Sequence, residues 1–132
     1  MQIKEIKQRI IDRLSDLGVA IHVYHAYSTK SIYIKLDYGA LGSIRISDHT
    51  GKKKYSYKYN IGTDIEEYVE VLENGKERKY YPCKDIDKLI CDILIEHCVK
   101  TSILDYEQMK QEKKENRNTD VSFWRNCKEI RG

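Results

Sequence analysis

The sequence predicts an α+β fold: an N-terminal helix, then an antiparallel sheet of four to five strands, then two C-terminal helices, with the helices on one face of the sheet. Apolar residues recur at helical spacing near both ends of the chain, whereas apolar and polar residues alternate in its middle part. The chain also contains 11 tyrosines but only one phenylalanine and one tryptophan. Tyrosine favours half-buried sheet faces, because its ring is apolar and its hydroxyl is polar.

The first predicted element is a helix over residues 3–17. Its apolar residues are three or four positions apart, which places them on one helical face. They are Ile3, Ile6, Ile10, Leu14 and Leu17. Gly18 is expected to end the helix, since glycine readily adopts the left-handed conformation found at helix C-termini.

The predicted strands lie between residues 20 and 81. They are expected at 20–27, 31–38, 43–47, 55–61 and 67–72. Asn74-Gly75 predicts a hairpin turn. The chain then returns as an edge strand over 76–81, which Pro82 ends because proline has no amide hydrogen to donate to a ladder.

The alternation assigns the tyrosines to two faces of the sheet. Tyr33 lies opposite the apolar residues of its own strand, so we expect it to be exposed beside Lys35 and Arg45. Tyr55, Tyr57 and Tyr59 share a face with Ile61, so we expect them to cover the core.

A second helix is predicted over 84–99 and a third through about residue 115, with Thr101 or Ser102 as the N-cap of the third. Residues 1–115 are expected to form a single α+β domain. Residues 116–132 then form a C-terminal tail with the only tryptophan, Trp124, which is expected to dock on its own core, on another copy or on a partner.

The composition predicts a soluble protein of the cytoplasm that has no contact with a membrane. No apolar run approaches the roughly 20 residues that span a bilayer, and the N-terminus lacks the apolar core of a signal peptide. The four cysteines lack CxxC spacing, which favours free thiols over a zinc site. We predict no metal site, no cofactor and no catalytic residue. A net charge of +3 does not decide for or against nucleic acid.

The strongest candidate for a binding site is the polar face of the strands around residues 31–47. Arginine and lysine on this face can bind phosphate, and tyrosine can stack on a base. The candidate ligand- or partner-binding residues are Ser31, Tyr33, Lys35, Arg45, Ser47, Asp48 and His49. A solvated outer face is the alternative. Asp48 and His49 suit acid–base chemistry, but an aspartate that caps a turn explains them equally.

A lysine-rich turn is the second candidate. Lys52, Lys53, Lys54 and Lys58, interleaved with tyrosines, resemble a nucleic-acid-binding surface in composition. The alternative is a charged hairpin tip that keeps the sheet from aggregating. A divalent-metal nuclease is not expected, because Asp37 lacks the acidic-x-Lys pair that such a site needs on the next strand.

The runs Ser31-Ile32-Tyr33-Ile34-Lys35-Leu36 and Ile44-Arg45-Ile46-Ser47-Asp48-His49 carry a resemblance. Residues 28–49 resemble a small domain of phage and conjugative-element proteins and are similar to segments of the large polyvalent proteins of such elements. The resemblance implies a mobile-element protein, and small proteins of that origin often counter bacterial immunity, including CRISPR–Cas systems. It implies no catalytic residue.

Three functions follow as hypotheses. The first is a phage accessory protein (an anti-CRISPR or other anti-defence protein) that binds and blocks a host defence protein or nuclease complex in the bacterial cytoplasm. The second is a protein that sequesters a nucleotide signal through Tyr33, Lys35 and Arg45. The third is a DNA- or RNA-binding accessory protein. A homodimer through the edge strand at 76–81 or through Trp124 remains open.

Overall fold

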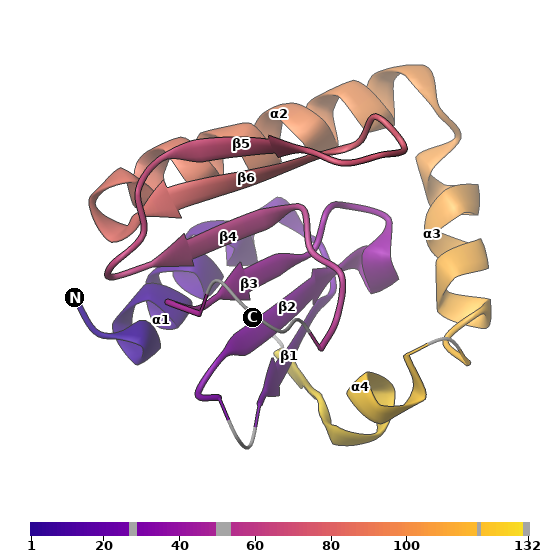
Figure 1. Cartoon of the computed structure of the whole chain (residues 1–132). Helices are drawn as coiled ribbons and strands as arrows, with labels where there is room; N and C mark the ends of the chain where they lie inside the picture. Colours follow the sequence, from indigo (N-terminus) through magenta and orange to yellow (C-terminus); the bar gives the residue numbers. More distant parts are fainter. Residues whose placement is uncertain (27–28, 50–53, 119, 131–132) are drawn as a thin grey trace.

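The computed structural model describes residues 1–26, 29–49, 54–118 and 120–130. It has the α+β class that the sequence predicts (Figure 1). Its helices are α1 (Ile3–Leu14), α2 (Ile86–Ile103), α3 (Tyr106–Glu115) and α4 (Val121–Asn126). Its strands are β1 (Ile21–His25), β2 (Ile32–Leu36), β3 (Ile44–Ile46), β4 (Tyr59–Gly62), β5 (Tyr68–Val71), β6 (Glu77–Pro82) and β7 (Lys128–Ile130).

The described strands form one mixed sheet in the order β5-β6-β4-β3-β2-β1-β7. The prediction of an antiparallel sheet of four to five strands is therefore wrong in strand number and direction, because β4 runs parallel to both β3 and β6. The hairpin at Asn74-Gly75 is confirmed, but its second strand, β6, is interior and β5 forms the edge. The alternation of apolar and polar residues indicates on which face of the sheet a side chain lies, but it does not indicate the direction of a strand or which strands are its neighbours.

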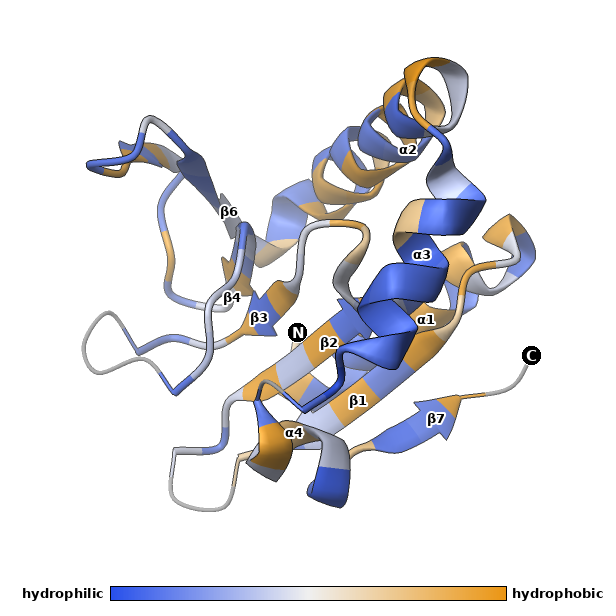
Figure 2. Ribbon diagram, turned by 90° about the vertical axis from the view of Figure 1, so that its right-hand side faces the viewer, coloured by the Kyte–Doolittle hydropathy of each residue, from blue (hydrophilic) through white to orange (hydrophobic). Residues whose placement is uncertain are grey.

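Helices α1 and α2 cover one face of the sheet, which is aliphatic. The helical spacing in α1 is confirmed, since Ile6, Ile10 and Leu14 are fully buried and Gly18 has the expected left-handed backbone. They pack against Ile34 and Ile44 from the centre of the sheet. Figure 2 shows how hydropathy changes between successive residues of β1 and β2, which alternate between this face and the opposite one. None of the helices within the described ranges is both long and apolar enough to cross a lipid bilayer.

The boundary between α2 and α3 differs from the prediction. Thr101 and Ser102 lie inside α2, where their hydroxyls donate to carbonyl oxygens of the preceding turn, so neither caps a helix. Asp105 is the N-cap of α3 and accepts the Gln108 amide at 3.2 Å. Tyr106, at the start of α3, donates to the buried Asp37 carboxylate at 2.6 Å, which fixes α3 to the end of β2.

The opposite face of the sheet is aromatic. Tyr24, Tyr33, Tyr55 and Tyr57 pack there around Phe123 of α4, which is fully buried. The expectation that the helices share one face is therefore wrong. The C-terminal segment also adds a strand, because β7 pairs with β1. All four cysteines are free, as predicted.

Candidate functional site

A row of polar and aromatic side chains crosses the aromatic face from β5 to β1. Its members are register partners in successive strand pairs, so they point to the same side of the sheet. In order, the row is Tyr68, Tyr80, Asn60, Arg45, Tyr33 and Tyr24. The row places a guanidinium and an amide in the middle of the sheet.

The sequence correctly places Tyr33 and Arg45 on this face, but the expectation that they are exposed is wrong. They are only 3% and 1% exposed, because Tyr55 and Tyr57 cover them. The segment with these two tyrosines is not part of a strand, since β4 begins at Tyr59. Of the three tyrosines predicted to share the face of Ile61, only Tyr59 does so.

Ser47, Asp48 and His49 form a structural corner at the carboxyl end of β3. The Ser31 hydroxyl donates to Ser47 at 2.8 Å, and both serines are buried, contrary to the predicted solvated face. The carboxylate of Asp48 accepts the Asp64 amide at 3.0 Å and the Thr63 hydroxyl. Burial disfavours its charged form, but these hydrogen bonds outweigh burial and lower its pKa. Asp48 therefore caps a turn, which is the structural role that the sequence analysis gives as the alternative to acid–base chemistry.

The predicted lysines do not form one surface. Lys35 pairs with Asp120 at 3.1 Å beside the rings of α4, and Lys54 donates to the Tyr24 hydroxyl at 2.7 Å. Lys52 and Lys53 lie outside the described residues. Lys58 lies instead at a cleft that the sequence does not predict.

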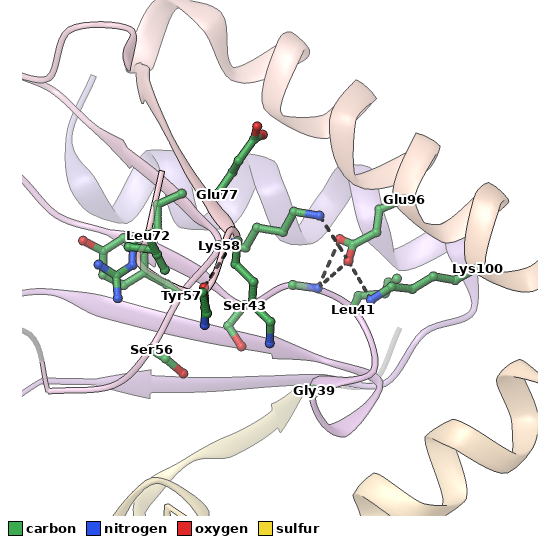
Figure 3. Close-up of a pocket in the computed structure, with 14 residues that line it drawn as sticks. Gly39, Leu41, Ser43, Ser56, Tyr57, Lys58, Leu72, Glu77, Glu96 and Lys100 are labelled. Carbon is green, nitrogen blue, oxygen red and sulfur yellow. Dashed lines mark hydrogen bonds and ion pairs between the residues drawn. The ribbon is translucent and has the colours of Figure 1, made fainter. Parts of the chain in front are cut away.

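This cleft lies where the mutually parallel strands β3, β4 and β6 begin, and its volume is about 680 Å³. Figure 3 shows that its wall is built from separate parts of the chain: the Gly39–Ser43 loop, the approach to β4, the β5–β6 hairpin and the second half of α2. The charged side chains that line it are Lys58, Lys76, Glu77, Arg78, Glu96 and Lys100.

Glu96 of α2 anchors one side of the cleft. Its carboxylate accepts the Gly42 amide at 3.1 Å and the Tyr59 hydroxyl at 2.7 Å, and it pairs with Lys100 at 2.8 Å and Lys58 at 3.6 Å (Figure 3). Burial disfavours ionisation, but the hydrogen bonds from Lys100 and Tyr59 and the lysine charges outweigh it and lower the Glu96 pKa. The Glu96 charge is thus fully engaged with its own neighbours.

Gly42 has a specific role in this arrangement. A Cβ atom at this position would lie 2.8 Å from the Cβ atom of Lys58 and 2.7 Å from its Cδ atom. Contacts of this length do not occur between real carbon atoms, so a side chain would push the loop away from Lys58. Glycine therefore lets the loop bring its amide to Glu96.

Two arginine guanidinium groups lie near the Tyr57 ring on the other side of the cleft, where Tyr57 and Arg78 line the cleft and Arg45 is buried behind them. The guanidinium carbons of Arg45 and Arg78 lie 5.2 Å and 5.1 Å from the ring centre, and Arg45 also donates to the Tyr57 hydroxyl at 3.3 Å. Within the described part of the chain, the buried Nε atoms of both arginines have no hydrogen-bond acceptor. A buried donor without an acceptor destabilises a fold, so such groups usually have an additional partner.

The chemistry of the cleft therefore suits an anion. Four of its charged side chains are basic (Lys58, Lys76, Arg78 and Lys100) and two are acidic (Glu77 and Glu96), so the basic ones are in excess although Lys58 and Lys100 share Glu96. Arg78 also pairs with Glu70 at 3.5 Å, which orients its guanidinium. Among the residues described, no group of three or more histidine, cysteine, aspartate or glutamate side chains is placed to hold a metal ion.

Sequence reasoning missed Glu96, Lys100, Lys76, Arg78 and Tyr57 as members of one site. Only Glu96 carries a local signal, because it continues the helical spacing of the buried residues Leu89 and Ile93. A carboxylate at a core position predicts a buried partner. The other residues come together through strand order, which the sequence pattern does not contain.

Comparison of the chain with protein-family models, with curated proteins and with solved structures finds no match.

Proposed function

We propose that the protein is a non-catalytic binding protein that captures a phosphate-bearing ligand, a nucleic acid strand or a nucleotide, in the cleft at the start of β3, β4 and β6. The observation that carries this proposal is the Arg78 guanidinium, which lines the cleft and whose Nε donor has no acceptor among the described residues. Phosphate oxygens are the acceptors that guanidinium groups bind best.

The surroundings of Arg78 support an anionic ligand. Lys76 lines the cleft and is exposed, so it adds positive charge there, and no acidic side chain among the described residues forms an ion pair with it. The proposal replaces Tyr33, Lys35 and Arg45 on an open sheet face with Arg78, Lys76 and Tyr57 in a cleft.

Fluorescence anisotropy with labelled single-stranded oligonucleotides tests the proposal, and unlabelled mononucleotides and cyclic dinucleotides added as competitors distinguish a strand from a small signal. Two to three phosphate contacts predict an affinity loss of about tenfold between roughly 50 and 200 mM salt. The Lys76→Glu variant should weaken binding, whereas Lys4→Glu, the same charge change on exposed α1, should not. Equal loss in both variants, or no binding of any phosphate-bearing probe, would contradict the proposal.

A second candidate function is the blocking of a host defence protein or nuclease complex by a mobile-element protein. The resemblance of residues 28–49 motivates it, and exposed apolar side chains on β5 and on α2 favour a protein partner. Pull-down from bacterial cells that carry defence systems tests it. Recovery of a defence component that is lost when the apolar side chains are mutated supports this function, and recovery of none contradicts it.

A further inference from the structure

Strand β5 leaves one side of its backbone without a neighbouring strand, since it ends the described sheet. The Leu72 amide donates to the Lys76 carbonyl at 2.8 Å, which sets the phase of the antiparallel β5–β6 ladder. Hydrogen-bonded pairs alternate along such a ladder. The amides and carbonyls of Val69 and Val71 therefore point away from β6, toward the open edge.

The side chains of Val69 and Val71 lie on the same side of the sheet as α2. Their register partners are Lys79 and Glu77, and Lys79 pairs with Asp92 of α2 at 4.0 Å. At the start of β5, Glu67 forms an ion pair with Lys88 of α2. These two links hold the first half of α2 against the β5–β6 hairpin. Both valines are nevertheless exposed, Val71 by 68%.

Helix α2 has an exposed apolar stripe of its own, but this stripe is not part of the edge. Ile95, Val99 and Ile103 follow Asp92 by three, seven and eleven positions, so they share one side of the helix. The second half of α2 and the β5–β6 hairpin both line the cleft and diverge from each other (Figure 2). The exposed apolar side chains at the open edge are therefore those of Val69 and Val71, which we call the β5 edge. Exposed apolar side chains on an unpaired strand are typical of interaction sites.

We propose that the β5 edge binds an extended segment of a partner protein as an additional strand, a segment in which apolar and basic residues alternate. The apolar residues contact the side chains of Val69 and Val71, and the backbone pairs with the outward amides and carbonyls of the same two residues. The basic residues are required by charge complementarity, because Asp64, Glu66 and Glu73 are exposed at the two ends of the strand. The added segment thus gains main-chain hydrogen bonds, apolar burial and ion pairs together.

The same charges argue against a second copy of this chain as the occupant. Two β5 strands in antiparallel pairing would bring the glutamates of both copies to one seam, where Glu66 of one strand approaches Glu73 of the other. Like charges opposite one another destabilise a strand pair. This inference concerns a different surface from the proposed phosphate-binding cleft. It rests on the second candidate function only because both require a protein partner.

Peptide binding to the full chain tests the inference. The probe is an acetylated and amidated peptide of about nine residues that alternates valine and lysine, with a valine–glutamate peptide as control. Backbone amide shifts in NMR should change at Val69 and Val71 with the first peptide and not with the second. Val69→Pro removes an outward amide without touching the β6 ladder and should weaken binding about tenfold, the equivalent of one hydrogen bond. Val69→Thr retains the amide and the branched shape and should bind much more like the wild type.

Thermal unfolding of the proline variant shows whether it folds. If it does not, Val71→Lys, which adds a positive charge to the exposed strand, replaces it and should also weaken binding of the valine–lysine peptide. Equal binding of the two peptides, or shifts that map to the cleft instead of β5, would overturn the inference. A concentration-dependent dimer that Val69→Pro abolishes would overturn the choice of occupant in favour of a second copy. Because the phosphate probes bind elsewhere, failure here leaves the cleft proposal standing.

Discussion

The two faces of the sheet are equally buried at their centre but chemically different. On the face beneath α1 and α2, Ile34 and Ile44 are fully buried among other aliphatic side chains. On the opposite face, the neighbouring positions Tyr33 and Arg45 are almost as buried but keep polar groups under the cover of Tyr55 and Tyr57. Successive residues of β2 and β3 therefore point alternately to an aliphatic face and to a polar, aromatic face.

This difference separates a face that stabilises the fold from a face that positions polar groups. Full burial of an aliphatic side chain stabilises a protein by roughly 1.5–3 kcal/mol. A buried polar group contributes little unless it is paired, and the Asn60 Oδ1 and Arg45 Nε atoms have no partner within the described chain. We infer that the aliphatic face carries most of the stability.

Ile34→Ala is the strongest test of this difference. The side chain is fully buried on the aliphatic face, so its loss leaves a cavity and should lower the free energy of unfolding by about 2–5 kcal/mol. Chemical denaturation measures the change. A loss well below this range would show that the aliphatic face is less tightly packed than the structure indicates.

Glu96→Gln should have the next largest effect, and its effect should depend on pH. The pKa of Glu96 is lowered in the folded protein, so its charge stabilises the fold above the pKa of the unfolded state, about 4.3, and this stabilisation is lost as pH falls through the folded-state value. At neutral pH we expect the variant to be less stable by about 1–3 kcal/mol. Denaturation curves of the two proteins should converge below about pH 4, and a constant difference across that range would contradict the assignment.

Tyr33→Phe compares the other face at the residue next to Ile34. The variant keeps the buried ring and loses a hydroxyl that accepts the Lys54 amide at 3.3 Å. We expect a loss of about 0.5–1.5 kcal/mol, the contribution of one hydrogen bond. Denaturation beside Ile34→Ala measures it, and a loss as large as in that variant would mean that the two faces contribute alike.

Arg45→Met should have the smallest effect on stability. The buried guanidinium has a tyrosine ring and hydroxyl as neighbours but no carboxylate among the described ion pairs, so an apolar side chain of similar length should leave the unfolding free energy within about 1 kcal/mol. The same variant should still bind oligonucleotides or nucleotides in the anisotropy assay, because Arg45 does not line the cleft, whereas Arg78→Met should lose binding. Large destabilisation in Arg45→Met would assign the Arg45 guanidinium a structural role.

Local patterns predict much of the secondary structure because side-chain period is a local property. The helix over 3–17, the strands at 31–38, 43–47 and 67–72, and the Asn74-Gly75 turn all have counterparts in the structure. The prediction that Thr101 or Ser102 caps the third helix is wrong, because α2 continues through both residues. The prediction of a strand around Tyr55 and Tyr57 is wrong for a similar reason, since alternation of side chains does not by itself require a segment to pair with another strand.

The candidate site was predictable only in fragments. The sequence pattern places Arg45 on the correct face of the sheet, but it assigns Lys58 to a lysine-rich turn instead of the cleft. The sequence by itself determined the α+β class, the aliphatic helix faces and the side of the sheet on which each alternating residue lies, because these follow from backbone geometry within a few residues. The tertiary structure decided that Arg45 is buried, that β6 lies beside β4, and that Lys58 and Glu96 meet across a cleft. These features depend on contacts between residues distant along the chain, which no local period encodes.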